Sequence, residues 1–249
     1  MQTRKKIYFA SDFHFGVPDY AKSLEREKRI VEWLSEIQHD AAEVFLVGDI
    51  FDFWFEYKRV IPKGFVRVQG KIAELTDSGI SVHVFTGNHD MWMFDYLPKE
   101  LGIILYREPI TRTFSGKQFY IGHGDGLGPG DRGYKFIKKV FRNRFCQWLF
   151  ARLHPNFGIG LANYFSRSSR AAAGDESKYL GDDKEFLVQF CRNYLKHTHV
   201  DYFVFGHRHL ALDKPIGENS RYINLGDWLQ YNTYAVFDGS ELKLLKFEG

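Results

Sequence analysis

The chain has 249 residues, 44% of them hydrophobic and 26% charged, with a formal net charge of +3 at pH 7. This length fits one large α/β domain, residues 1–249, with a sizeable core, and the small charge indicates no class of partner. Cys146 and Cys191 form no Cys-X-X-Cys pair, so we expect two reduced, buried thiols and no thiolate zinc site. Because the sequence shows neither a signal peptide nor an apolar stretch of about 18 residues, we expect a soluble cytoplasmic protein.

Hydrophobic periodicity predicts alternating strands and helices in the first part of the chain. Strands are predicted at 5–10, 43–47 and 82–86, and amphipathic helices at 20–38 and 65–77. Short β segments follow at 103–122, and an almost wholly helical segment at 126–198. The last predicted elements are strands at 201–205 and 221–225 and a hairpin of 233–237 with 241–247. This order predicts stacked sheets with helices outside.

Polar residues follow five of the apolar runs at the point where each run ends. The five segments are Ser11-Asp12-Phe13-His14, Gly48-Asp49-Ile50-Phe51-Asp52, Gly87-Asn88-His89-Asp90, Gly122-His123-Gly124-Asp125 and Gly206-His207-Arg208-His209. Because right-handed crossovers place the carboxyl ends of parallel strands at one rim, we expect these segments to meet there. Asp12 and His14 are two residues apart, as are His207 and His209, so extended backbone would turn both members of each pair to one side.

These segments offer oxygen and imidazole donors without sulfur. The donors are Asp12, His14, Asp49, Asn88, His123, His207 and His209. They suffice for two divalent ions with open positions, and the donor types favour manganese or iron, with zinc possible. Asp49 is the natural bridge, since one carboxylate between two cations about 3.5–4 Å apart offsets their repulsion.

Each donor also has a structural alternative. An aspartate can be a helix N-cap or a turn former, and a histidine is commonly a core or surface residue. His197 and His199 have the same two-residue spacing but follow a charged helix, so we interpret them as structural, like His39, His83 and His154. The recurrence of donors after five strands favours the functional interpretation.

The ordered set Asp-X-His, Gly-Asp-X-X-Asp, Gly-Asn-His-Asp, Gly-His and Gly-His-X-His resembles the calcineurin-like metallophosphoesterase superfamily over residues 11–209. The resemblance implies an αββα sandwich of four layers with an inserted helical cap, and metal-dependent hydrolysis of phosphoric esters or pyrophosphates. It implies one metal held by Asp12, His14, Asp49 and His209, and a second held by Asp49, Asn88, His123 and His207. His89 would stabilise the transition state or protonate the leaving oxygen, oriented by Asp90.

A narrower resemblance rests on residues 48–54, on residues 123–127 followed by Asp131 and Tyr134, and on Leu225-Gly226-Asp227-Trp228. These segments are similar to the UDP-2,3-diacylglucosamine hydrolases of lipid A synthesis, which cleave a pyrophosphate to give UMP and 2,3-diacylglucosamine 1-phosphate. The best-known branch has arginine where this chain has His89, so the chain is closer to the histidine-bearing branch.

The same resemblance implies a set of substrate contacts. It places Asn88, His89, Asp131 and His207 against the substrate, and Asp131 could equally be the N-cap of the following helix. Arg167 and Arg170 are candidates for phosphate contacts.

The helical insertion, predicted as a lid at about 128–185, is both basic and apolar. Between Gly126 and Arg170, nine basic residues stand against one acidic residue, a net charge of +8, among many aromatic and aliphatic residues. Such a segment fits the anionic inner face of the cytoplasmic membrane, with its apolar side lining a groove for acyl chains. The alternative is a helical subdomain folded on its own core. Nucleic acid is not the expected partner, because the aromatic residues lie at core-like helical positions.

Three functions are considered from the sequence. The favoured one is a two-metal pyrophosphatase acting on a lipid-linked UDP-sugar, peripheral on the inner membrane face. The second is a metal-dependent phosphodiesterase or phosphatase for nucleotides or nucleic acids. The third, a binding module without catalysis, is disfavoured by the intact donor set. The sequence does not determine the native metal, the acyl-chain preference or the oligomeric state.

Overall fold

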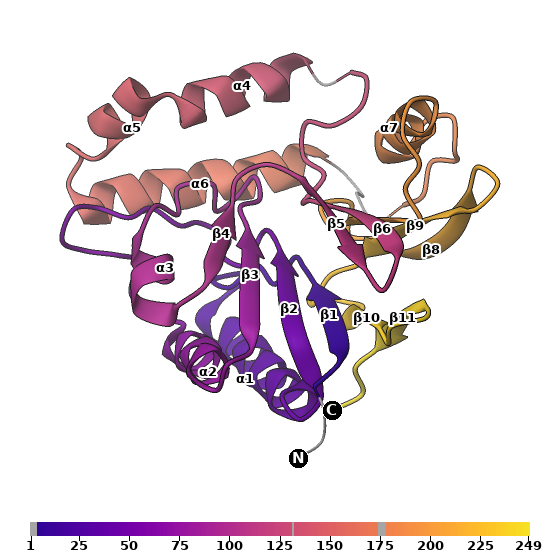
Figure 1. The fold of residues 1–249 in the computed structure, drawn as a ribbon. Helices are drawn as coiled ribbons and strands as arrows, with labels where there is room; N and C mark the ends of the chain where they lie inside the picture. The colour runs from indigo at the N-terminus through magenta and orange to yellow at the C-terminus, as the bar shows by residue number, and fades with distance from the viewer. Residues whose placement is uncertain (1–3, 131, 174–177) are drawn as a thin grey trace.

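Two β-sheets pack face to face, and helices cover their outer faces (Figure 1). This computed structural model describes residues 4–130, 132–173 and 178–249, without the side chains of residues 167–173. The strands of the first sheet, in spatial order, are β11 (Leu242–Lys246), β10 (Thr233–Phe237), β1 (Lys6–Ala10), β2 (Ala41–Val47), β3 (Ser81–Phe85) and β4 (Ile104–Tyr106). The first four strands of the chain run parallel, and β10 joins β1 in the antiparallel direction.

The second sheet supplies the remaining strands of the rim. Its strands, in spatial order, are β5 (Ile110–Phe114), β6 (Lys117–Ile121), β7 (Tyr202–Phe205), β9 (Ser220–Leu225) and β8 (Ala211–Ile216). Strands β6, β7 and β9 are parallel, while β5 and β8 are antiparallel edges. The parallel strands of both sheets have their carboxyl ends on the same side of the molecule.

Alternation of side chains along β1 builds two cores at once. Ile7 and Phe9 pack toward the second sheet, whereas Tyr8 and Ala10 pack toward the helices α1 (Tyr20–Ile37) and α2 (Val66–Asp77). The helix α7 (Phe186–Leu195) covers the outer face of the second sheet. The predicted α/β class, with stacked sheets flanked by helices, is confirmed.

Three further helices lie between β6 and β7 in the sequence: α4 (Arg132–Arg142), α5 (Arg144–Phe150) and α6 (Pro155–Ala173). The side chain of Asn143 caps α5, and Pro155 occupies the first position of α6, where its missing N–H costs nothing. In Figure 1, α6 crosses above the ends of β1, β2 and β3. Among the described residues, no helix is both long and apolar enough to cross a bilayer.

Two elements of the structure were not predicted. The helix α3 (Tyr96–Leu101) has only six residues, with Pro98 in its first turn, so it carries little periodicity. The edge strand β8 contains Asp213, Lys214 and Pro215, which weaken a strand pattern. Proline is tolerated there because β8 is at the edge of the sheet.

Candidate active site

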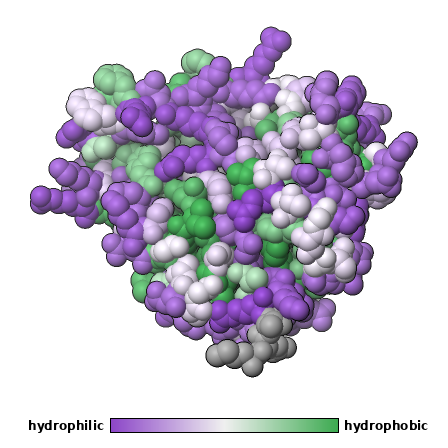
Figure 2. All heavy atoms as spheres, in the orientation of Figure 1, coloured by the Kyte–Doolittle hydropathy of each residue, from purple (hydrophilic) through white to green (hydrophobic). Residues whose placement is uncertain are grey.

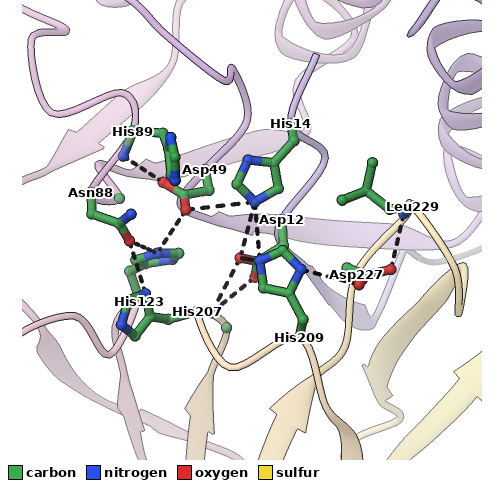
Figure 3. A network of polar contacts seen from close by, with 12 residues as sticks. Asp12, His14, Asp49, Asn88, His89, His123, His207, His209, Asp227 and Leu229 are labelled. Carbon is green, nitrogen blue, oxygen red and sulfur yellow. Dashed lines mark hydrogen bonds and ion pairs between the residues drawn. The ribbon is translucent and has the colours of Figure 1, made fainter. Parts of the chain in front are cut away.

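All seven predicted donors come together at the rim (Figure 3). Each follows the carboxyl end of β1, β2, β3, β6 or β7. The shortest contacts join side chains that lie far apart in the sequence. Asn88 Oδ1 is 2.8 Å from His207 Nδ1, and His14 Nε2 is 3.1 Å from His209 Nε2.

The donors form two groups that share Asp49. In the first group, His209 Nε2 lies 3.3 Å and His14 Nε2 3.7 Å from Asp12 Oδ1. Asp49 Oδ2 lies 3.7 Å from His14 Nε2 and 3.3 Å from His123 Nε2, so one carboxylate oxygen faces both groups.

The second group contains His123, Asn88 and His207. Asn88 Oδ1 lies 3.1 Å from His123 Nε2 and 2.8 Å from His207 Nδ1. The position that Asp49 takes between the two groups is the one expected of a bridging ligand between two cations.

Five of the donors have a left-handed backbone. The φ angles are 57° at Asp12, 46° at His14, 52° at Asp49, 67° at His207 and 49° at His209. The expectation that extended backbone aligns the two histidine-containing pairs is therefore wrong, although both pairs do reach the site. Each such residue costs about 1–2 kcal/mol, and backbone hydrogen bonds such as His14 N to the Asp49 carbonyl hold the conformation. Strain of this kind is typical of functional sites.

Two glycines allow the loops to approach the carboxylates. A Cβ added to Gly87 would lie 2.1 Å from Asp49 Oδ1, and one added to Gly206 would lie 2.3 Å from Asp12 Oδ2. No side chain fits at those distances, so glycine is required at both positions by close approach.

In three of the histidines, the ring nitrogen Nδ1 faces a hydrogen-bond acceptor. His209 Nδ1 lies 3.1 Å from Asp227 Oδ2, His123 Nδ1 lies 2.9 Å from the Val47 carbonyl, and His14 Nδ1 lies 3.5 Å from Asp52 Oδ1. These acceptors favour hydrogen on Nδ1 and leave Nε2 to bind a cation. The sequence analysis assigned no role to Asp52 or Asp227. Their presence in the segments of the narrower resemblance was the only indication that they could be functional.

His89 lies beside the first group and contacts the helical insertion. Its Nδ1 is 3.2 Å from the Asp52 carbonyl and 3.1 Å from Ser166 Oγ on α6. Asp90 was expected to orient this ring, but its carboxylate accepts hydrogen bonds from the backbone N–H groups of Gly87, Ile50 and Phe51. Asp90 therefore holds the loop that carries His89, and Asp52 and Ser166 contact the ring.

The buried carboxylates attract positive charge. Burial opposes ionisation of Asp12, but the charge of His209 and a hydrogen bond from His14 lower its pKa to about 2. Burial also disfavours a charged His14, yet hydrogen bonds to Asp12 and Asp52 raise its pKa to about 10.

The second group contains an imidazole that stays neutral. Burial and the charge of His123 lower the pKa of His207 to about 4. Two ionised carboxylates, a neutral imidazole and three imidazoles whose Nδ1 faces an acceptor fit divalent cations well.

The remaining predicted residues lie elsewhere or outside the described part. Asp131 is not among the described residues, nor are the side chains of Arg167 and Arg170. His83 is buried against Phe45, with Nε2 2.8 Å from Glu43. The candidate metal-binding groups among the described residues are Asp12 with His14 and His209, His14 with Asp49 and His89, and Asp12 with Asp49 and His123. The histidines interpreted as structural belong to none of these groups.

Comparisons with known proteins show which family the chain is similar to. The family model described as Calcineurin-like phosphoesterase matches residues 5–211. A protein of Porphyromonas gingivalis named UDP-2,3-diacylglucosamine hydrolase is 41% identical over 98% of this chain and 98% of its own length. A protein of the same name from Histophilus somni is 26% identical over 90% of this chain and 92% of its own length. Among solved structures, the E. coli phosphoesterase Yfce aligns over 97% of this chain and 92% of that chain, with a TM-score of 0.47 and 15% identity.

Proposed function

Because the chain belongs to the calcineurin-like phosphoesterase family and is therefore a hydrolase, we propose that it cleaves the pyrophosphate bond of UDP-2,3-diacylglucosamine to UMP and 2,3-diacylglucosamine 1-phosphate. The observation that carries the proposal is the convergence of seven donors from five strand ends around Asp49. The substrate is supported by the relative that is 41% identical over nearly its whole length. His89 lies beside these donors and is the proposed proton donor.

The residues have distinct proposed roles. Asp12, His14, Asp49 and His209 would hold one divalent ion, and Asp49, Asn88, His123 and His207 the other, with manganese favoured over iron or zinc. Such ions supply Lewis-acid stabilisation of phosphate charge and lower the pKa of water. Asn88, His89 and His207 lie where a phosphate over the cluster would contact them.

His89 would hold the proton for the leaving oxygen. The Asp52 carbonyl can only accept, so Nδ1 of His89 keeps its hydrogen, and when the ring is doubly protonated the second hydrogen, on Nε2, is the one that it would deliver to the leaving oxygen. Ser166 connects this ring to α6, so closure of the helical lid, residues 128–185, would also fix the proton donor.

The lid is also the proposed membrane-binding element. Its helices α4 and α5 contain no buried residue, and Phe145 and Trp148 are 64% and 51% exposed. Figure 2 shows hydrophobic residues among hydrophilic ones along the edge where these helices lie in Figure 1. An apolar surface flanked by lysine and arginine fits the anionic inner face of the cytoplasmic membrane.

Hydrolysis of the lipid-linked UDP-sugar tests the proposal directly. Manganese-loaded protein should release UMP from UDP-2,3-diacylglucosamine, a chelator should stop the release, and added manganese should restore it. If the loaded protein cleaves bis-p-nitrophenyl phosphate but leaves the lipid substrate intact, the phosphodiesterase alternative replaces the proposal.

Vesicle sedimentation tests the membrane contact. The protein should bind vesicles rich in phosphatidylglycerol more tightly than neutral vesicles, and Trp148→Ser should weaken that binding. The matched control is Tyr20→Ser, because Tyr20 is 78% exposed on α1, outside the lid. Equal loss of binding in both variants would contradict a lid-specific contact.

A further inference from the structure

An open pocket of about 650 Å³ lies beside the candidate active site. Its walls come from three segments that are far apart in the sequence: the residues after His14, the first half of α1, and the loop after β9. The volume is within the range of about 300–1,000 Å³ that is usual for small-molecule sites. Nothing in the proposed roles of the seven donors uses this pocket.

Hydrogen bonds connect the walls of the pocket to the donor group of Asp12, His14 and His209. Arg26 Nη2, from α1, donates to the carbonyl of His14 at 2.7 Å. The backbone N–H of Trp228 donates to the carbonyl of Asp12 at 3.2 Å, and the preceding Asp227 contacts His209. The pocket therefore adjoins Asp12, His14 and His209.

The helical insertion lies toward the other side of the cluster. Ser166 contacts His89, and the ring of Tyr134 on α4 lies 6.5 Å from that of His207. Figure 3 shows Leu229 beside Asp227 and His209, with Asn88 and His89 on the opposite side of the cluster. A substrate whose central pyrophosphate lies over the cluster would extend one half under the helices and the other half into the pocket.

The pocket has the charge and surface that suit a phosphorylated nucleoside. Lys22, Arg26 and Arg29 line it against one acidic residue, Glu25. Arg26 is only 5% exposed, and its guanidinium is held at the wall of the pocket by the carbonyls of His14 and Val17. Guanidinium and ammonium groups donate to phosphate oxygens and to the carbonyl oxygens of a pyrimidine.

The same pocket offers apolar surface beside these donors. Pro18 and Leu229 line it, and Leu229 is 37% exposed. A flat base can cover such surface while its polar edge meets the basic side chains.

We propose that this pocket binds the nucleoside monophosphate half of the substrate, the part released as UMP. The assignment rests on the proposed function for the identity of the nucleotide. It adds Lys22, Arg26 and Arg29 as residues that distinguish a nucleotide from other phosphate compounds, a role that the metal cluster alone would not provide.

Binding of UMP and of inorganic phosphate tests the assignment without measuring turnover. On the manganese-loaded full chain, titration calorimetry should show UMP binding at least about tenfold more tightly than phosphate. Lys22→Glu and Arg29→Glu should each reduce that preference by about tenfold, because phosphate uses the metals and UMP also uses the pocket. The matched control is Lys28→Glu, which makes the same charge change at an exposed position of α1 outside the pocket.

The outcomes separate the two proposals. An unchanged preference in Lys22→Glu and Arg29→Glu, or an equal loss in Lys28→Glu, would overturn the pocket assignment, the latter because it would show a general charge effect. If the lipid substrate is not cleaved while the UMP preference still depends on Lys22, the proposed function fails and the pocket assignment stands.

Discussion

At the scale of the residue, one hydrogen bond sets which nitrogen His209 presents to the cluster. Asp227 Oδ2 faces His209 Nδ1, while Asp227 Oδ1 accepts from the backbone N–H groups of Leu229, Gln230 and Tyr231. An asparagine could keep its oxygen on the backbone groups, but its amide would then donate toward Nδ1. The ring would have to carry its hydrogen on Nε2, where a metal should bind.

Asp227→Asn should therefore lower manganese affinity by about 10–100-fold, since outer carboxylates of histidine ligands have effects of that size. Titration calorimetry of the metal-free protein with manganese measures the loss. Asp213→Asn is the control, because Asp213 pairs with Arg221 on β9 and touches none of the seven donors. Unaltered affinity in Asp227→Asn would mean that the His209 tautomer does not depend on this contact.

The glycines of the rim give a second residue-scale prediction. Gly87→Ala should reduce hydrolysis and manganese binding by more than tenfold, because its Cβ would overlap Asp49 Oδ1. Gly70→Ala is the matched control in α2, where an added Cβ meets no atom within 4 Å. That control should raise the free energy of unfolding by about 0.5–1 kcal/mol in urea denaturation. A fully active Gly87→Ala would contradict the close approach.

The donors themselves could be predicted from the sequence, but their backbone could not. Aspartate and histidine after an apolar run indicate a rim, since strand ends meet there. Nothing in the spacing of Asp12 and His14 distinguishes extended from left-handed backbone, because tertiary hydrogen bonds select the strained conformation. The contact of Ser166 with His89 was likewise beyond prediction, since 77 residues separate the pair.

At the scale of the element, the loop with His207 and His209 is fastened to the start of α7. Arg208 Nε and Nη2 donate to the carboxylate of Glu185, at 3.0 and 2.9 Å. Glu185 also accepts from the backbone of Leu180. Both side chains of the ion pair are at least nine-tenths buried, and breaking a buried, hydrogen-bonded ion pair by removing one partner is strongly destabilising.

Glu185→Gln should lower the free energy of unfolding at pH 7 by about 3 kcal/mol. Burial opposes ionisation of Glu185, but hydrogen bonds from Arg208 and Leu180 hold its pKa below the ordinary 4.5. Its contribution is thus complete above pH 4.5 and is lost as the pH falls toward the folded pKa. Urea denaturation should show that the difference in free energy of unfolding between wild type and variant is smaller at pH 4 than at pH 7.

Asp183→Asn provides the control two residues away. Asp183 is 95% exposed in its pair with Arg192, so its loss should change stability by less than about 0.5 kcal/mol. If the difference in free energy of unfolding between wild type and Glu185→Gln is the same at both pH values, the ion pair is not the source of that difference.

Elements with strong periodicity were predicted well. The helices α1 and α2 and the strands before each donor loop lie within a few residues of their predicted positions, because long apolar patterns dominate local preference. Short or edge elements such as α3 and β8 were missed, since Pro98 and Pro215 interrupt their patterns and neighbouring elements stabilise them.

At the scale of the whole molecule, the cluster places two buried, ionised aspartates among four imidazoles, two of which are buried and two partly buried. Bound cations should therefore stabilise the entire fold, since the unfolded chain has no assembled site. Manganese at about 100 times its Kd adds about 2.7 kcal/mol, which raises the Tm by about 5–10 °C for a chain of this size. Calorimetric scans with manganese and with a chelator measure the difference, and Asp49→Asn should abolish most of it. A Tm independent of metal would contradict the site.

The layered architecture followed from the sequence, whereas the order of the strands did not. Alternating strands and helices indicate stacked sheets with helices outside. The position of β10 beside β1 depends on a pairing between distant segments that no local pattern specifies, and the pairing of β9 with β7 passes over the strand that lies between them in the sequence. The lid residues fit either a membrane surface or a separate core by composition, and the sequence did not indicate which of their apolar side chains are exposed.

The pairing of β1 with β10 has a consequence for biosynthesis. Phe9 pairs with Ala235, and the loop after β9 bonds to the Asp12 carbonyl. During translation, β1 is synthesised long before β10, the strand that pairs with its free edge. A fragment ending at residue 226 should accordingly bind no manganese, as calorimetry can check against the full chain. The nascent polypeptide must then keep its future reaction centre half assembled until the codons for β10 have been read.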